Sequence, residues 1–463
     1  MAASRVLDPF TSWLRAARET VIRNTYQPAA SMPRPGWRRA LLLATLVVVG
    51  AILSLARTPI RDWSVLWAED ALVFLDGAYH SDLSVLLVPY SGYLHVVPRL
   101  LAEISALFPL EAASVVMTVL AAVTLSAVAC ASYVFLETVV RGVFLRVAVW
   151  LSIVAAPVGG GEVLNNAANL HWFMLIAGVC AIVARPRPGA GMVAAQAVVL
   201  SLAVLSDALG LLLIPLVVLR ATLLRGRSEW VKAIIVGVAG VIQLGGTFVG
   251  TIMLGGRQSS DSAPTLGEFV DFHAVRVIAP AIVGDAAAQK ALLLLGPLLT
   301  WGAVAALAII LIVLILNGES NRGQIVLLAL GSLAFSAVAG ILQWEWIGGS
   351  SRVDFNTVGR YAVVPVILLV LALLVAADAA FQRSSSRRIA VGLGAAVLAW
   401  VLVLTAIDAT RDNHRAGTPS WSDGVREAIT RCEDGAESAL LPVAPAFLTF
   451  GLPCSTILEH APR

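Results

Sequence analysis

The sequence has too few charged residues to cover the surface of a soluble protein. Only 13% of its 463 residues are charged, against roughly 25% in a soluble domain, and 59% are hydrophobic. Lysine is nearly absent, with Lys232 and Lys290 alone, so arginine carries almost all of the positive charge; this bias is typical of a GC-rich genome such as that of an actinobacterium. The net charge of +3 is too small to indicate a nucleic-acid partner. With a mean hydropathy of +0.86, this composition predicts a protein embedded among membrane lipids.

The sequence also lacks the cysteine spacings that bind metals. Its four cysteines include no CxxC pair, and Cys130 and Cys180 fall inside apolar runs, where a thiol behaves as a small hydrophobe. Cys432 and Cys454 lie in the polar C-terminal segment instead. We expect these two to form a disulfide, which would stabilise a small cap by about 3 kcal/mol in the chain-entropy model; two free thiols are the alternative.

Eleven apolar runs approach the length of about 20 residues that a membrane-spanning helix needs, and the third to the fifth of them are short. The sequence therefore predicts an all-α, polytopic bundle of about eleven spans, without internal repeats. The runs cover residues 40–57, 112–136, 143–158, 170–184, 190–206, 208–224, 232–254, 291–316, 324–343, 361–380 and 389–407.

Arginines gather in alternate loops of this scheme, and such loops stay in the cytoplasm. The N-terminus is therefore predicted on the cytoplasmic side of the cell membrane. The C-terminus is predicted on the outer side, where a disulfide persists. We expect a cytoplasmic segment over 1–39, a transmembrane domain over 40–407 and an extracytoplasmic cap over 408–463. Within the first of these, 8–25 has the apolar stripe of a helix lying on the inner leaflet, although an arginine-rich disordered tail is the alternative.

The predicted first outer loop, 58–111, holds two adjacent acids. Glu69 and Asp70 follow the first span closely, in the run Trp67-Ala68-Glu69-Asp70. A carboxylate among aromatic residues has restricted solvation, which raises its pKa and makes it a better proton acceptor. The alternative is a solvated pair of acids on an outer loop.

A turn and a helix follow these acids in the same loop. The turn PYSGY contains Tyr93 and is followed by His95, and we consider both candidates for substrate binding. Residues 94–108 are predicted to form a helix at the membrane interface. Arg99 in this helix could hold a phosphate in a fork of hydrogen bonds, or it could pair with Glu103.

Two other predicted outer turns carry polar residues. Asn165, Asn169, His171 and Trp172 lie between the third and fourth spans, where they would suit sugar hydroxyls or a phosphate. The two asparagines are spaced to share a helical face, and helix capping with an aromatic anchor is the alternative reading. Asp207 lies between the fifth and sixth spans, where a carboxylate is either costly and functional or a helix cap.

The loop before the tenth span adds three candidates for binding the substrate or its phosphate. Arg352, Arg360 and Tyr361 lie within the polar run that begins at Trp344. Arg360 lies at the edge of the span, where it could snorkel to the interface or grip a lipid phosphate.

The layout resembles the GT-C superfamily of integral-membrane glycosyltransferases. The resemblance rests on the run 67–70 soon after the first span, on the long first outer loop with interfacial helices, and on Gly359-Arg360-Tyr361. It implies an inverting transfer from a polyprenyl-phosphate sugar donor to an envelope glycan, glycolipid or protein, with Asp70 or Glu69 as the base. It also implies that Arg99, Arg352 or Arg360 stabilises the leaving phosphate.

The resemblance leaves the cofactor open, since some members bind a divalent metal ion, Mg²⁺ or Mn²⁺, at the acid and others need none. The short C-terminal segment departs from members that carry large soluble outer domains. A transporter or flippase for a lipid-linked or small solute is the alternative function, and it predicts charges near the middle of the membrane and paired repeats. A non-catalytic envelope scaffold is a third possibility.

Overall fold

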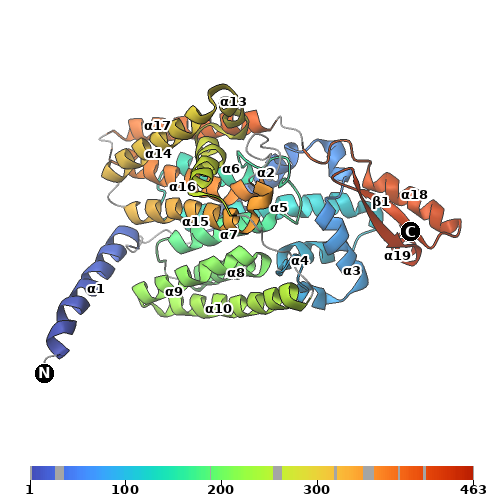
Figure 1. Cartoon of the computed structure of the whole chain (residues 1–463), viewed down its shortest axis with the longest axis horizontal. Helices are drawn as coiled ribbons and strands as arrows, with labels where there is room; N and C mark the ends of the chain where they lie inside the picture. The colour runs from blue at the N-terminus through green and yellow to red at the C-terminus, as the bar shows by residue number, and fades with distance from the viewer. Residues whose placement is uncertain are drawn as a thin grey trace.

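The computed structural model describes residues 3–26, 36–187, 189–253, 263–317, 321–347, 359–383, 386–409 and 413–461. This part of the chain is mostly helical, and its main helices run side by side along the long axis of the molecule (Figure 1). Six helical segments are long and apolar enough to cross a membrane. They are α2 (Trp37–Ala56), α5 (Ala113–Leu136, extended by the turn from Leu110), α10 (Arg227–Phe248, continued by the π-helical turn η6, Val249–Met253), α15 (Arg322–Ile347), α16 (Arg360–Phe381) and α17 (Arg387–Asp408).

Five shorter apolar helices complete the bundle and coincide with the other predicted runs. These helical stretches are shorter than a typical membrane span. That each of them crosses the membrane therefore stays a prediction, as does the total of eleven spans. They are α6 (Val143–Val154), α7 (Leu170–Val183), α8 (Ala190–Ser206), α9 (Leu213–Leu224, preceded by the turn η5, Ala208–Leu212) and the stretch Pro297–Ile310 of α14 (Pro297–Asn317).

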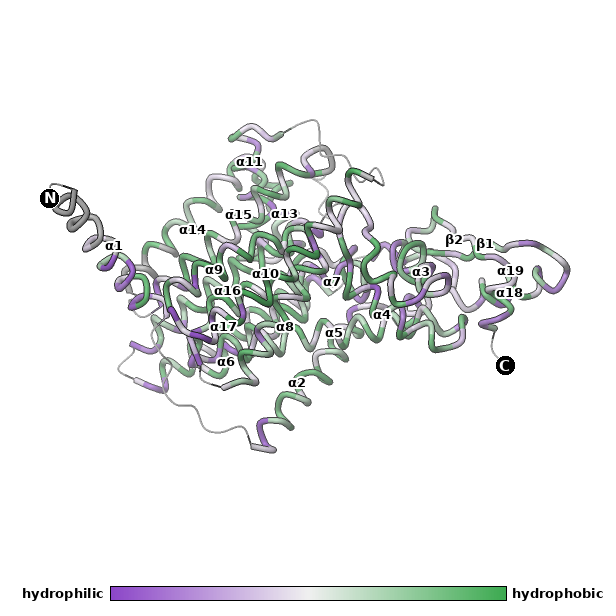
Figure 2. The backbone as a smooth tube through the Cα atoms, turned by 90° about the horizontal axis from the view of Figure 1, so that it is seen from below, coloured by the Kyte–Doolittle hydropathy of each residue, from purple (hydrophilic) through white to green (hydrophobic). Residues whose placement is uncertain are grey.

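The bundle has a buried centre and an apolar outside. Every side chain of α7 is buried, as is 89% of the most apolar window of α16, whereas the same measure is 17% for α2 and α17. A helix that is hydrophobic all round belongs in a core or in lipid. Hydrophobic residues dominate the helices, and hydrophilic ones gather at their ends and in the cap (Figure 2). This pattern fits peripheral helices that face lipid.

Short helices of the first outer loop and of the segment between α10 and α14 cover parts of the bundle. Helix α4 corresponds to the helix predicted over 94–108 and buries Val97, Leu101 and Ala102 while it exposes Leu100 and Ile104. The loop elements are η1 (Ile60–Ser64), the π-helix η2 (Asp70–Leu75), α3 (Asp76–His80), η3 (Leu83–Leu87), α4 (Val96–Ser105) and η4 (Leu110–Ala112). The later segment forms α11 (Leu266–His273), η7 (Ala274–Ile278), α12 (Ala279–Val283) and α13 (Asp285–Leu295).

The N-terminal helix α1 (Ala3–Thr25) contains the predicted helix 8–25 and points away from the bundle (Figure 1). Its C-terminal half is anchored by hydrogen bonds to two other helices. Arg18 Nε donates to the carbonyl oxygen of Leu223 at 2.9 Å, and Gln324 Nε2 donates to the carbonyl oxygen of Thr25. The exposed Trp13 lies farther out on the same helix.

The C-terminal cap contains strands that the all-α prediction missed. Helix α18 (Trp421–Glu433) is followed by the antiparallel strands β1 (Ser438–Val443) and β2 (Leu448–Pro453) and by α19 (Cys454–Glu459). Side chains along β1 alternate between exposed and buried, and the buried ones pack against α18, so a half-buried hairpin is favoured over a helix. Cys432 and Cys454 form the predicted disulfide, with their Cα atoms 5.3 Å apart.

The cap is docked on the first outer loop. The buried Trp421 donates from Nε1 to the carbonyl oxygen of Leu110 at 2.7 Å. The backbone nitrogen of Ala444 donates to the carbonyl oxygen of Leu66 at 2.8 Å. The cap therefore holds both ends of the loop that carries Glu69 and Asp70.

Candidate functional site

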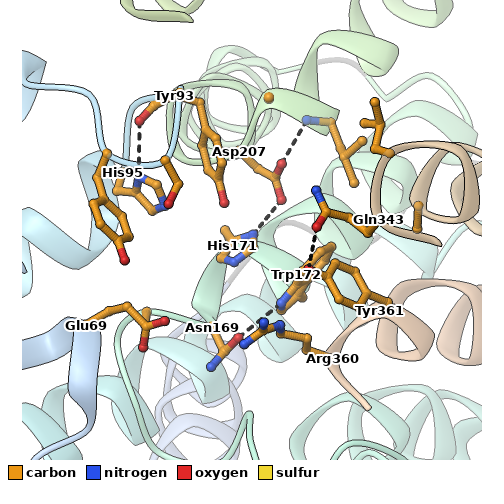
Figure 3. A pocket seen from close by; sticks show the side chains of 18 of the residues that line it. Glu69, Tyr93, His95, Asn169, His171, Trp172, Asp207, Gln343, Arg360 and Tyr361 are labelled. Atoms are coloured by element: carbon orange, nitrogen blue, oxygen red, sulfur yellow. Dashed lines mark hydrogen bonds and ion pairs between the residues drawn. The ribbon is translucent and has the colours of Figure 1, made fainter. Parts of the chain in front are cut away.

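A cavity of about 460 Å³ lies where the first outer loop meets α7, α15 and α16. Its lining comes from parts of the sequence that are far apart, and Figure 3 shows their side chains converging on a common space. Eight of the residues predicted from the sequence line it, namely Glu69, Tyr93, His95, Asn169, His171, Trp172, Arg360 and Tyr361. Phe74, Tyr90, Asp207, Leu209, Thr251 and Gln343 are among the others.

The two adjacent acids face different surroundings. Asp70 is 1% exposed, and its two carboxylate oxygens accept hydrogen bonds from the backbone nitrogens of Ala167 (3.0 Å) and Ala168 (2.8 Å). Burial raises the pKa of Asp70 to about 7, against the opposing effects of these hydrogen bonds and of Arg415. Because Asp70 does not line the cavity, its visible role is to hold the turn before α7.

Glu69 is the acid that lines the cavity. Its Oε2 atom is buried and has no hydrogen-bond partner among the described residues. Other buried polar atoms of the described residues also have no such partner, Glu103 Oε1 among them, and Glu69 is the one of these residues that lines the cavity. A ligand hydroxyl that donates to Glu69 would provide the missing hydrogen bond.

His171 and Asp207 form a buried pair in the wall of the cavity. His171 Nδ1 lies 2.5 Å from Asp207 Oδ2, and the other carboxylate oxygen accepts from the backbone nitrogen of Leu209 at 2.8 Å. Asp207 is therefore the helix cap that the sequence offered as one alternative, and it also orients an imidazole. An ionised carboxylate only accepts hydrogen bonds, so Nδ1 of His171 is the donor of this pair and Nε2 is left for another partner.

Arg360 supplies positive charge on the side of the cavity where Asn169 lies (Figure 3). Its backbone nitrogen donates to a carboxylate oxygen of Glu162 at 3.2 Å, and its guanidinium lies 3.8 Å from the other oxygen. The guanidinium also lies over the ring of Tyr361, 5.3 Å from the centroid. Tyr361 in turn donates to Gln343 Oε1 at 3.3 Å. The one long ion-pair contact leaves other guanidinium N–H groups to bind an anion.

Aromatic rings form much of the remaining wall. Tyr93 and His95 stack with their centroids 4.2 Å apart, and Trp172 lies 5.7 Å from Tyr361. Burial, together with the proximity of His171, lowers the pKa of His95 well below its usual value, so its ring is neutral near pH 7. Aromatic faces of this kind can stack on the apolar face of a sugar ring.

Besides Asp70, two predicted residues lie outside the cavity, and one more lies outside the described residues. Arg99 is 3% exposed and lies over the ring of Phe74, 5.6 Å from the centroid, and within the part of the chain that the structure describes it forms no ion pair with Glu103. Asn165 is buried at the end of α2, where its Nδ2 donates to Ser54 O and Thr58 Oγ1, both at 2.8 Å. Arg352 falls in the range 348–358, which the structure does not describe.

The predicted helical face shared by Asn165 and Asn169 is wrong. Asn165 has a φ of 51°, a left-handed conformation that a helix cannot continue through. Its side chain donates a hydrogen bond to the carbonyl oxygen of Ser54 in the last turn of α2. The side-chain oxygen of Asn169 instead accepts a hydrogen bond from Trp172 Nε1 at 3.2 Å. The two amides therefore serve different neighbours.

Arg415 is a residue of the site region that the sequence did not reveal. It is 3% exposed and reaches from the C-terminal segment to the carbonyl oxygen of Asn165 (2.6 Å) and to Thr118 Oγ1 (3.2 Å). Burial lowers its pKa to about 10, while the charges of Asp70 and Asp62 act in the opposite direction. No local pattern distinguishes this arginine from others in a polar tail.

Comparison with protein families and curated sequences identifies no relative of this chain. No protein-family model matches it, and no curated protein matches its sequence. Within the described ranges no three histidine, cysteine, aspartate or glutamate side chains are grouped as a metal site. The chemistry of the cavity is therefore the basis for assigning a function.

Proposed function

We propose that the chain is a membrane glycosyltransferase that moves a sugar from a polyprenyl-phosphate donor to an envelope acceptor at the outer face of the cytoplasmic membrane. One observation carries the proposal. A cavity between apolar helices and the first outer loop combines the unpartnered Glu69 oxygen, the Arg360 guanidinium and several aromatic rings. These groups correspond to the three needs of the reaction, namely a proton acceptor, a cation for the phosphate and a surface for the sugar.

The proposed reaction is a single displacement with inversion. Glu69 removes the proton from a hydroxyl of the acceptor, and the oxygen forms a bond to the anomeric carbon of the donor. The bond from that carbon to the phosphate oxygen breaks, and polyprenyl phosphate leaves with the bonding electrons. Arg360 stabilises the negative charge that develops on the phosphate, which is the kind of preorganised electrostatic contribution that lowers barriers most.

Asp70 supports this chemistry indirectly. Its carboxylate fixes the backbone at 167–168, immediately before Asn169 and His171. Removal of this carboxylate would release two backbone N–H groups from buried hydrogen bonds, at a cost of about 1–3 kcal/mol each. We therefore assign Glu69 to proton transfer and Asp70 to positioning.

The test compares carboxylate variants of the whole chain in lipid nanodiscs by their release of polyprenyl phosphate. Each variant receives labelled polyprenyl-phosphate monosaccharides as donors and an envelope lipid extract as acceptor. Glu69→Gln should reduce release of polyprenyl phosphate by about 10²- to 10⁴-fold, the usual contribution of a general base, while the donor still binds and the melting temperature is unchanged. Asp70→Asn should lower both activity and the melting temperature.

Glu103→Gln is the matched control, because this carboxylate belongs to the same outer loop but does not line the cavity. Its activity should equal that of the unaltered protein. Full activity of Glu69→Gln would refute the assigned base. Movement of intact donor across the membrane without release of polyprenyl phosphate would instead favour the transporter alternative.

A further inference from the structure

A second cavity, of about 350 Å³, lies between the start of α6, the end of α16 and the start of α17. This is the end of the bundle opposite the C-terminal cap (Figure 1). Helices α16 and α17 are both long and apolar enough to span a membrane. A cavity at their ends would therefore lie at the depth of lipid headgroups.

The wall of this cavity has two arginines and one acid, and the carboxylate of the acid already accepts hydrogen bonds from the backbone. Arg141 and Arg387 line it, and within the described part of the chain neither forms an ion pair. The acid is Asp378, whose two oxygens accept from the backbone nitrogens of Arg141 (2.9 Å) and Gly142 (2.7 Å). Burial and the nearby charge of Arg141 both lower the pKa of Arg185, so positive charges crowd one another here.

A neighbouring cluster adds to the excess of positive charge. Three arginines share the single carboxylate of Glu137, with Arg39 at 2.7 Å, Arg146 at 3.1 Å and Arg187 at 3.0 Å. Glu137, at the centre of this cluster, follows α5 and precedes α6 in the sequence, as Arg141 does. Basic pockets between helices on the cytoplasmic side of membranes favour the head groups of anionic lipids.

The other walls of the cavity are apolar. Phe144, Leu145, Phe381 and Val391 line it, and exposed side chains such as Ile389 (57%) continue the apolar surface along the helix. Free phosphate would gain nothing from these groups, whereas acyl chains would. We propose that this cavity binds the phosphate of an anionic phospholipid between Arg141 and Arg387, with the acyl chains along α6 and α17.

The proposal is independent of the glycosyltransferase function and is tested by lipid binding. Full-length protein, delipidated by washing in detergent, is titrated with phosphatidylglycerol, and binding is followed by native mass spectrometry and by the melting temperature. The double variant Arg141→Gln/Arg387→Gln should weaken binding about 30-fold, from the usual contribution of each arginine near an anionic lipid. Arg141→Lys/Arg387→Lys should retain most of the affinity because the charge is kept.

Arg388→Gln is the matched control, since this exposed arginine is adjacent in sequence but does not line the cavity. It should bind phosphatidylglycerol as the unaltered protein does. Zwitterionic phosphatidylcholine and water-soluble glycerol 3-phosphate should both fail to raise the melting temperature. Undiminished binding in the double glutamine variant, or an equal loss in Arg388→Gln, would overturn the proposed site.

Discussion

At the scale of single residues, the cavity depends on a pair that is remote in sequence. His171 lies in α7 and Asp207 lies between α8 and η5, and the 2.5 Å contact between them leaves Nε2 of His171 to bind a ligand. Under the proposed function, we expect this nitrogen to form a hydrogen bond with a second hydroxyl of the acceptor and so to direct the reacting hydroxyl toward Glu69. His171 is then a binding residue, and Asp207 positions it.

We predict that His171→Asn and Asp207→Asn each lower kcat/KM for the acceptor by about 10- to 100-fold, the range expected for a lost hydrogen bond to a charged or strongly polarised group. The KM for the donor should change little. The double variant should be no worse than the poorer single variant, because the two residues act as one unit. Steady-state kinetics measure all three.

His273→Asn provides the control, because His273 is largely buried in another part of the chain, bonded to Ser336 Oγ at 3.0 Å, and does not line the cavity. It should retain the kinetics of the unaltered protein. Strictly additive losses in His171→Asn and Asp207→Asn would show that the two side chains act separately, which would contradict the pairing.

Residue chemistry in the sequence identified eight of the residues that line the cavity but not how their side chains are directed. Glu69 and Asp70 are equivalent candidates in sequence, and only the start of η2 at Asp70 sends one carboxylate toward the cavity and the other into the backbone of 167–168. Arg99 has the right chemistry for a phosphate, yet its helix turns it onto Phe74. Long-range contacts of this kind have no local signature.

At the scale of elements, the length of the apolar runs predicted the helices of the bundle but did not predict the strands of the cap. Each of the eleven apolar runs contains a helix, because a run of about 20 apolar residues has few alternatives in lipid. The run 291–316 is broken at Gly296, whose φ of 53° separates α13 from α14. The strands β1 and β2 have six residues each, and their stability depends on α18, so their own sequence gives a weak signal. The disulfide was predictable because only two cysteines lie in polar sequence.

The cap offers a prediction about the coupling between elements. Trp421 is fully buried, and its indole donates to Leu110 O. Trp421→Ala should destabilise the cap by about 3–5 kcal/mol, the usual cost of truncating a large buried aromatic residue. Hydrogen exchange, followed by mass spectrometry, should then accelerate at residues 62–70 as well as within the cap, since Ala444 and Arg415 hold that loop.

Trp13→Ala serves as the comparison, because Trp13 is 63% exposed on α1. A surface substitution of this kind usually changes stability by less than 0.5 kcal/mol, so exchange in the cap and the first outer loop should be unaffected. Faster exchange that stays confined to the cap in Trp421→Ala would show that the cap does not support the loop.

At the scale of the whole molecule, orientation links the cavity to its substrate. The arginine cluster surrounds Glu137, directly after α5, whereas the disulfide-bonded cap is hydrogen-bonded to Leu110, just before the start of α5. Arginine-rich ends remain in the cytoplasm, and disulfides persist outside it. Two independent rules therefore predict the same orientation, with Glu69 on the outer side.

Cysteine labelling in intact cells tests this orientation, because the native cysteines do not interfere. Cys130 and Cys180 are buried, and Cys432 and Cys454 are joined. A membrane-impermeant maleimide should label Ser81→Cys, an exposed position in the first outer loop.

The matched variant is Ser228→Cys, which is equally exposed but lies near the start of α10, at the predicted cytoplasmic end. It should be labelled only after the membrane is permeabilised. The reverse pattern would place the Glu69 cavity in the cytoplasm and would contradict a reaction at the outer face, even if the residues of the cavity were all correctly assigned. Labelling of both positions in intact cells would mean that both lie on the outer side, so that the number of spans between them is even and not odd. The function of the cavity thus depends on the side of the membrane as much as on its side chains.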